Sequence, residues 1–180
     1  MLISEKIMQK NQETLDQSDP SIKLAGSLAD YAAAELLIRQ YVKELGVDLE
    51  FQDLISELKN LPTIYGPPQG ALILVRSPES QPAGCAGIRS WQEPIAELKR
   101  MYIRPEFRKT GIGSKLLDHA IRAAHQLGYH RLRLDTLATM KSAQRLYLTR
   151  GFYEIPPYRY NPLPGTQFFE LNLQDNSQIP

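Results

Sequence analysis

The segment best suited to bind a ligand is a short basic run with two glycines at residues 108–113, Arg-Lys-Thr-Gly-Ile-Gly. It follows an apolar stretch that ends near Pro105, and a helical apolar period begins within it at Ile112. The two glycines permit positive φ angles and leave room for a ligand against the backbone. N–H groups at the start of a helix attract an anion, so this spacing predicts a phosphate or pyrophosphate site. A plain glycine turn before an amphipathic helix is the alternative.

This run differs from the two best-known phosphate loops. A P-loop requires Lys-Ser or Lys-Thr after its second glycine, and a dinucleotide-binding loop requires a third glycine three positions after the second. Here Ser114, Lys115 and Leu116 follow Gly113, so neither pattern is complete. A nucleotide-binding protein of either class is therefore not predicted.

Composition narrows the class of protein. With 21 Lys and Arg against 20 Asp and Glu, the net charge of +1 argues against a surface that coats nucleic acid. Cys85 is the single cysteine, which excludes an intrachain disulfide, fits a reducing compartment and is more typical of a core residue than of a nucleophile. The three histidines show no metal-ligand spacing, and the longest apolar run, residues 71–75, is too short to span a bilayer. The chain starts without a signal-peptide pattern, so we expect a cytoplasmic protein. Because the histidines lack metal-ligand spacing, we expect no metal.

The chain length suits one domain, expected over residues 21–173, between a mobile polar leader at 1–20 and a loose tail at 174–180. Apolar periodicity and turn residues then predict the order of the elements. We expect a strand over 22–28, helices over 30–45 and 48–61, strands over 71–75, 83–91 and 95–103, a helix from 112 that stops at Gly128, a strand over 130–135, a helix over 139–150, and strands over 151–155 and 166–173.

Two motifs and this element order together resemble the GNAT superfamily of N-acetyltransferases. Residues 108–113 are similar to the family's Gln/Arg-x-x-Gly-x-Gly/Ala signature. Residues 143–152, Ala-Gln-Arg-Leu-Tyr-Leu-Thr-Arg-Gly-Phe, are similar to its Ala-x-x-Leu-Tyr-x-x-x-Gly-Phe segment. The resemblance covers residues 22–173 and implies an α/β (α+β) fold. Its mixed, mostly antiparallel central sheet would have six to seven strands flanked by about four helices.

By this resemblance the co-substrate is acetyl-CoA, held without a metal in a notch where the strands ending at Ile103 and near Asp135 separate. Backbone groups of residues 101–103 would pair with the pantetheine arm, and backbone amides of residues 109–114 would hold the pyrophosphate. Many relatives have an asparagine where this chain has Met140, which leaves Thr139 or Ser142 to supply that polar contact. The implied cofactor-binding set is Met101, Tyr102, Ile103, Arg108, Lys109, Thr110, Gly111, Ile112, Gly113, Ser114, Ser142 and Tyr147.

Acetyl transfer to an amine requires a base for the amine proton, a donor for the developing oxyanion and an acid for the departing thiolate. The resemblance makes Tyr147 the candidate acid, and a phenol with a pKa of about 10 suits that role. A core tyrosine is the alternative. Glu97 is the candidate base by similarity to histone-acetylating members of the family. Its alternatives are ordered water as the base, and a glutamate paired with a basic side chain across the sheet. The backbone N–H of Met101 is the implied oxyanion donor.

The acceptor is the least determined part of this interpretation. We predict an enzyme that moves an acetyl group to a primary amine of a small molecule, amino acid or peptide by direct attack in a ternary complex. Nucleic-acid and membrane partners are not expected, and a homodimer is left open. An acyl-CoA-binding sensor or structural module without turnover is the alternative. Arg89 and Arg100 are candidates for holding an acceptor carboxylate, although an arginine on a strand is more often part of a solvated face. The aromatic and charged residues expected around the acceptor are Tyr31, Arg39, Glu57, Arg89, Trp91, Tyr158, Tyr160 and Phe168.

Overall fold

The computed structural model describes residues 20–47, 53–175 and 179–180. The predicted leader therefore lies outside the described residues except for Pro20, and the predicted tail lies partly outside them. The start of the helix predicted over 48–61 also falls outside, at residues 48–52. In the described part, none of the helices has the length and apolar character that crossing a bilayer requires.

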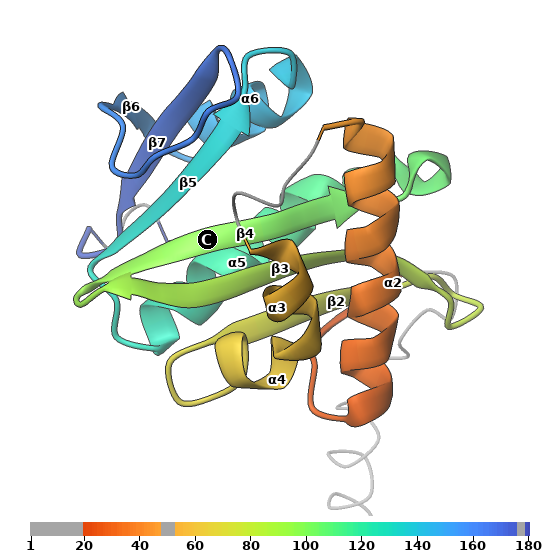
Figure 1. The fold of residues 1–180 in the computed structure, drawn as a ribbon. Helices are drawn as coiled ribbons and strands as arrows, with labels where there is room; N and C mark the ends of the chain where they lie inside the picture. The colour runs from red at the N-terminus through yellow and green to blue at the C-terminus, as the bar shows by residue number, and fades with distance from the viewer. Residues whose placement is uncertain (1–19, 48–52, 176–178) are drawn as a thin grey trace, which may run out of the picture.

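A seven-stranded mixed sheet forms the centre of the described chain, in the order β1-β2-β3-β4-β5-β7-β6 (Figure 1). Neighbouring strands run antiparallel except for β4 and β5, which are parallel. The predicted mixed, mostly antiparallel sheet is therefore confirmed. The strands are β1 Ser21–Leu24, β2 Ala71–Arg76, β3 Pro82–Gln92, β4 Ile95–Ile103, β5 Arg131–Leu137, β6 Tyr153–Ile155 and β7 Thr166–Asn172.

Helices cover both faces of this sheet (Figure 1). On one face lie α2 (Leu28–Leu45), α3 (Leu54–Lys59) and α4 (Leu61–Ile64), and on the other lies α5 (Ile112–Gln126). The last helix, α6 (Lys141–Leu148), follows β5, and a 3-10 turn, η2 (Pro105–Phe107), joins β4 to the glycine run.

The helix ends follow from local chemistry, with one difference from the prediction. Ser27 Oγ accepts a hydrogen bond from the Asp30 N–H at the start of α2, and Gly46 ends the helix with a φ of 66°. The second predicted helix is divided, and Pro62 lies in the first turn of α4 instead of ending a helix. A proline is tolerated there because first-turn N–H groups have no acceptor within the helix.

Two apolar cores stabilise the arrangement, one on each face of the sheet. α5 buries Leu116, Leu117 and Ile121 against one face, and α2 buries Leu37 and Ile38 against the other. β2 contributes alternate residues to both cores, which confirms the burial on two faces that its continuous apolar sequence predicts.

β4 contains the irregularity that shapes the site. Its register pairs Gly87 with Lys99 and Cys85 with Tyr102, so three steps along β4 match two along β3. Arg100 adopts a φ of 56°, a left-handed conformation that is uncommon for a residue with a side chain. This β-bulge bends β4 and increases its twist.

β4 and β5 pair only at the start of each strand. The parallel register runs from Ile95 with Arg131 to Glu97 with Arg133. Beyond Glu97 the two strands separate, and Figure 1 shows β5 rising away from β4 below the upper end of α2. The predicted notch between the strands that end at Ile103 and near Asp135 is therefore present in the fold.

Candidate active site

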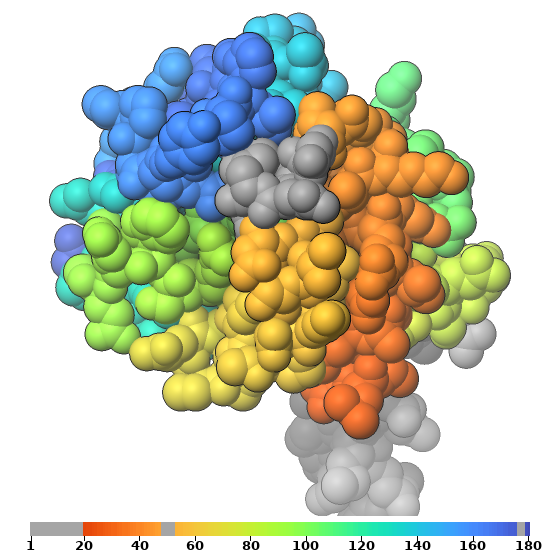
Figure 2. Space-filling model, in the orientation of Figure 1, coloured from red at the N-terminus to blue at the C-terminus, as the bar shows by residue number. Residues whose placement is uncertain are grey.

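A cleft opens where β4 and β5 separate, with a cavity volume of about 60 Å³. We call it the β4–β5 cleft, and its lining includes Tyr41 and Leu45 near the C-terminal end of α2. Figure 2 shows the same side of the molecule, with α2 in orange on the right and the C-terminal segment in blue at the upper left. Polar and charged side chains of its lining come from several elements: Tyr41 of α2, Lys99 and Arg100 of β4, Asp135 of β5, Tyr147 of α6, and Asn161 from the loop before β7.

The glycine run forms a turn directly before α5. Gly111 has a φ of 85° and precedes the first helical residue. The first backbone bond across this boundary runs from the Lys115 N–H to the Gly111 carbonyl, so the N–H groups of the first turn have no acceptor within the helix. A Cβ added at Gly111 would meet no atom within 4 Å, and one added at Gly113 would lie 3.8 Å from Leu146 Cδ2. The turn therefore borders open space and fits a pyrophosphate.

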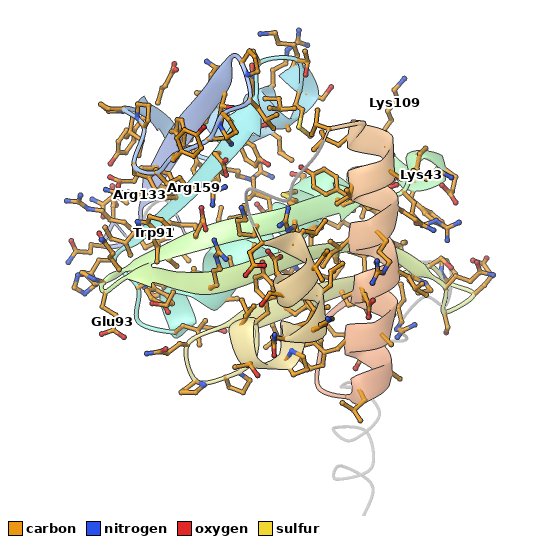
Figure 3. All side chains as sticks on the ribbon, viewed as in Figure 1. Lys43, Trp91, Glu93, Lys109, Arg133 and Arg159 are labelled. Atoms are coloured by element: carbon orange, nitrogen blue, oxygen red, sulfur yellow. The ribbon has the colours of Figure 1, made fainter. Side chains whose placement is uncertain are left out.

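The basic side chains of this run have different surroundings. Arg108 pairs with Glu44 of α2 at 2.7 Å, donates from Nε to the Ile103 carbonyl at 2.9 Å, and lies over the Tyr102 ring. Lys109, in contrast, projects away from the body of the molecule near the end of α2 (Figure 3). Arg108 thus fastens the loop to α2, while Lys109 is available to a ligand at the surface.

The remaining hydroxyls of the run make local contacts. Thr110 Oγ1 donates to the Phe107 carbonyl at 2.8 Å. Ser114 Oγ accepts a hydrogen bond from Arg150, whose guanidinium also pairs with Asp118 at 2.6 Å. These bonds hold the turn and the first turn of α5 in place.

The predicted pantetheine strand is the end of β4. Tyr102 and Ile103 keep their register with β3, and the Tyr102 hydroxyl donates to Glu44 at 3.0 Å. Met101 lies within the bulge, has no partner in the β3 register and lines the β4–β5 cleft. The bulge thus turns this stretch of backbone toward the opening between the strands.

Tyr147 lies on the buried face of α6 and lines the β4–β5 cleft, with 7 % of its surface exposed. Its ring contacts Phe152 and Phe169 at centroid distances of 5.7 and 6.4 Å. Its hydroxyl has no hydrogen-bond partner among the described residues. Burial, reinforced by nearby Tyr41 and Asp135, raises the pKa of Tyr147 above its usual value, so the hydroxyl remains protonated.

The two candidates for the polar contact that an asparagine makes in many relatives lie near the start of α6. Ser142 is exposed in the first turn, and Thr139 is exposed just before it. Met140 lines the cleft, and its sulfur accepts a weak hydrogen bond from Thr136 Oγ1 at 3.6 Å.

Glu97 belongs to a row of alternating charges across the sheet. The register places Arg89 beside Glu97, Glu97 beside Arg133, and Arg133 beside Glu170. Side chains at such directly opposed positions attract one another when their charges differ. Figure 3 shows Arg133 at the side of the molecule away from Lys109.

The Glu97 carboxylate is completely buried and both of its oxygens are occupied. Oε2 accepts from Arg89 Nε and Nη2 at 2.9 and 2.6 Å, and Oε1 accepts from the Tyr158 hydroxyl at 2.8 Å. Arg159 Nη1 lies 3.4 Å from Oε1. This is the cross-sheet pairing named above as an alternative for Glu97. Its role as a base stays a prediction, because accepting a proton would require these contacts to change.

The structure brings together only some of the residues expected around the acceptor. Trp91, Tyr158 and Phe168 form edge-to-face contacts with centroids 5.4 Å apart, over the charged row. Arg39 pairs with Glu35 on an exposed face of α2, away from the cleft lining.

Tyr31 and Tyr160 also do not line the β4–β5 cleft. Tyr160 is 80 % exposed, although it lies in the same segment as Tyr158 and Asn161.

Glu57 and Arg100 form a buried pair beside the β4–β5 cleft. Arg100 Nε and Nη2 each donate to a Glu57 oxygen at 2.8 Å, and Glu57 Oε1 also accepts from the Tyr65 hydroxyl. Although burial opposes ionisation of Glu57, the Arg100 guanidinium lowers its pKa overall. The pair therefore remains charged at neutral pH.

Sequence reasoning missed Lys99 and did not give Asp135 a role. Burial lowers the pKa of Lys99 to about 7, against the attraction of Glu97 and Asp135. For Asp135, Lys99 and Arg159 together outweigh burial and lower the pKa. Asp135 accepts from Arg159 Nη2 at 3.0 Å and from Asn161 Nδ2 at 2.6 Å. No local sequence pattern indicated this pair, because β4 and β5 no longer pair beyond Glu97 and Arg133 and the two side chains meet only at the cleft.

Comparison with known proteins identifies the family. The model of the Acetyltransferase (GNAT) family matches residues 32–152. An uncharacterized N-acetyltransferase of Schizosaccharomyces pombe is 36 % identical over 154 residues, which cover 85 % of this chain and 93 % of that protein. A GNAT-family acetyltransferase structure from Staphylococcus aureus has a TM-score of 0.72 at 23 % identity and covers 86 % of this chain and 99 % of its own.

A second solved structure carries the expected co-substrate. A Salmonella typhimurium protein solved with its cofactor acetyl-CoA has a TM-score of 0.62 at 20 % identity, and the match covers 87 % of this chain and 95 % of that one. The fold, the open glycine turn and these matches agree. The chain belongs to the GNAT family of acetyltransferases and is an acyl-CoA-dependent N-acyltransferase.

Proposed function

We propose that this enzyme transfers an acetyl group from acetyl-CoA to the primary amine of a small molecule, amino acid or peptide within a ternary complex. The observation that carries the proposal is the β4–β5 cleft, which is lined both by Met101 in the β4 bulge and by Tyr147. Direct attack requires both substrates to meet in one place, and a cleft bordered by a strand end and a phenol provides it.

We infer that the N–H groups of residues 109–114 hold the pyrophosphate. The absence of a Cβ at Gly111 and Gly113 leaves the space for it, and Lys109 adds positive charge at the surface. Arg108 supports the site indirectly, because its contacts with Glu44 and Ile103 hold the loop against α2 and β4. Ser142 is the exposed hydroxyl at the start of α6 that substitutes for the missing asparagine.

Acetyl-CoA would supply a thioester, and the chain supplies the proton donors around it. The backbone N–H of Met101, in the bulge, is the donor for an oxygen that gains negative charge. Tyr147 donates its proton to the leaving sulfur, since its raised pKa keeps the hydroxyl protonated and its ring is held by two phenylalanines. Glu97 is the proposed base. Ordered water in the cleft is the alternative, and it is favoured because the Glu97 carboxylate already accepts hydrogen bonds from Arg89 and Tyr158.

Thermal unfolding with acetyl-CoA, CoA and ATP tests the cofactor part of the proposal. Both CoA compounds should stabilise the protein by about 2.7 kcal/mol at a hundredfold excess over Kd, and ATP should not. Release of the CoA thiol in a panel of amines then tests turnover. Stabilisation by CoA compounds without thiol release from any amine would indicate an acyl-CoA-binding module, and equal stabilisation by ATP would contradict the assigned loop.

A further inference from the structure

The β4–β5 cleft presents charges of both signs from its two strands. Lys99 and Arg100 line it from β4, and Asp135 lines it from β5. The bulge at Arg100 allows these two consecutive residues of β4 to line the same cleft, where a regular strand would point them to opposite faces. β4 and β5 no longer pair beyond Glu97 and Arg133, but Lys99 and Asp135 remain close enough for each charge to affect the ionisation of the other.

Arg100 is held rigidly by two of its nitrogens, and its third nitrogen can still donate a hydrogen bond. Two of its nitrogens donate to Glu57, and its side chain is only 2 % exposed. Its third nitrogen, Nη1, makes no hydrogen bond within the described part of the chain, although Arg100 lines the cleft. A guanidinium has five N–H donors, so Nη1 can serve an oxygen in the cleft while the other two nitrogens keep the ion pair.

Glu57, which accepts the hydrogen bonds of Arg100, is itself held by a further contact. The Tyr65 hydroxyl donates to Glu57 at 2.8 Å, and the Tyr65 ring lies against Gly87, where an added Cβ would come within 2.5 Å of it. Gly87 is the β3 residue in register with Lys99. The strained φ of Arg100 is therefore maintained by surrounding contacts, as is common for residues that position a ligand.

Asp135, on the opposite side of the cleft, is also held in place by hydrogen bonds. Asn161 Nδ2 donates to its Oδ2 at 2.6 Å, and Arg159 Nη2 lies 3.0 Å from the same oxygen. Tyr41 is close enough to both Arg100 and Asp135 for their charges to affect its ionisation, and it also lines the cleft. The cationic side and the carboxylate thus lie on opposite walls of one small cavity beside Tyr147.

We propose that the acceptor is an amino acid or similar amine with a free carboxylate, which binds Arg100 Nη1 and Lys99 while its amine donates a hydrogen bond to Asp135. The proposal rests on the proposed acetyl transfer and adds the substrate class. A charged hydrogen bond in a buried site discriminates strongly against an analogue that lacks the charge, because the buried Arg100 Nη1 donor then remains unpaired. Burial and the charges of Arg100 and Arg159 disfavour the charged form of Lys99, whereas Glu97 and Asp135 favour it. A bound carboxylate would favour this charged form further.

Matched acceptors test the proposal on the unmodified enzyme. Each amino acid is compared with its carboxamide and with the amine that lacks the carboxylate, by CoA thiol release at saturating acetyl-CoA. We expect kcat/KM to be at least about tenfold higher for the free acid, equal to about 1.4 kcal/mol. The same pairs are tested by thermal unfolding of the CoA-saturated protein, where only the free acids should add a shift. Equal or greater kcat/KM and shifts with the carboxamides would overturn the proposal and point to a peptide or simple amine.

The outcome separates this inference from the proposed function. Failure to bind CoA would contradict the acetyltransferase assignment, whereas CoA binding without acid selectivity would contradict the acceptor class alone. A Lys99→Met variant should reduce the acid-to-carboxamide ratio about tenfold, and Lys59→Met on exposed α3 should leave it unchanged. An unchanged ratio in a folded Lys99→Met protein would remove Lys99 from the assignment. If that variant does not fold, the comparison of acids with carboxamides on the unmodified protein still decides the proposal.

Discussion

Tyr147 illustrates how burial defines the chemistry of a single side chain. Its ring is packed between Phe152 and Phe169, and its hydroxyl lies at a cleft without a partner among the described residues. Burial raises its pKa, so the proton needed by a leaving thiolate is present throughout the neutral and mildly alkaline range.

Replacement of Tyr147 by phenylalanine tests this role. We expect kcat to fall about 100-fold, because general acid catalysis contributes on that order, while the affinity for CoA remains unchanged. Stability should change little, because no described hydrogen bond is lost. Steady-state kinetics and calorimetry with CoA are the measurements. Tyr153→Phe, on the edge strand β6, is the control, and an unchanged kcat in Tyr147→Phe would reject the acid role.

Glu97 is the residue whose predicted role and observed contacts differ most. Glu97→Gln would leave Arg89 and Arg159 facing a neutral group in a buried site, so we expect a loss of about 3 kcal/mol in the free energy of unfolding. Urea unfolding measures this loss, with Glu93→Gln on the exposed turn as the matched control. The pH–rate profile separates the roles: disappearance of its acidic limb in Glu97→Gln would support the base, and an unchanged shape would support ordered water.

Among the elements, the turn into α5 and the bulge in β4 supply the backbone of the proposed site. The turn contains positive φ angles at Lys109 and Gly111, and the bulge contains one at Arg100. The bulge lies where β4 and β5 separate, and the turn precedes first-turn N–H groups of α5 that have no acceptor within the helix. The regular parts of the same elements bury apolar side chains and keep both irregularities in place.

The two glycines of the turn should respond differently to alanine. Gly111→Ala places a Cβ at a φ of 85° and should cost about 1–2 kcal/mol of stability, although no atom lies within 4 Å of the added carbon. Gly113→Ala lies in α5, where the added Cβ would make only an ordinary contact with Leu146 Cδ2 at 3.8 Å, so stability should stay equal or rise by about 0.5 kcal/mol. CoA affinity of Gly113→Ala should nevertheless fall about tenfold or more, as the Cβ enters the ligand space. Urea unfolding and calorimetry measure the two effects, and full CoA affinity in Gly113→Ala would contradict the pyrophosphate site.

Across the whole molecule, buried carboxylates connect separate elements. Glu57 joins α3 to β4, Asp135 joins β5 to the loop that contains Arg159, and Glu170 joins β7 to β5. Burial opposes ionisation of each, yet the basic partners lower the pKa of all three overall. Each of these ion pairs joins elements on one side of the cleft, the Glu57 pair on the β4 side and the other two on the β5 side.

This arrangement predicts the pH dependence of stability. Because the folded-state pKa values lie below the unfolded ones, the carboxylates stabilise the fold above about pH 4 and this contribution is lost as pH falls further. The free energy of unfolding, measured with urea at several pH values, should be nearly level from pH 6 to about 5 and decline below about 4. A stability that stays level down to pH 2 would show that these pairs contribute little.

The sequence alone determined the parts of this protein that depend on local patterns. The glycine turn, the apolar face of α5, the segment around Tyr147 and the order of strands and helices are readable because propensity and periodicity act over a few residues. These features were enough to indicate the family and the mixed sheet, and to place the notch between β4 and β5.

Only the tertiary structure decided which side chains meet. The β4 bulge brings Lys99 and Arg100 to one cleft, Asp135 lines the same cleft from β5, and the pairing of Glu97 with Arg89 and Tyr158 occupies its carboxylate. Arg108 is likewise bound by Glu44, a residue 64 positions away. Such contacts depend on register, twist and packing between distant segments, and a single strand's pattern carries no information about a one-residue bulge or the charge that will face it.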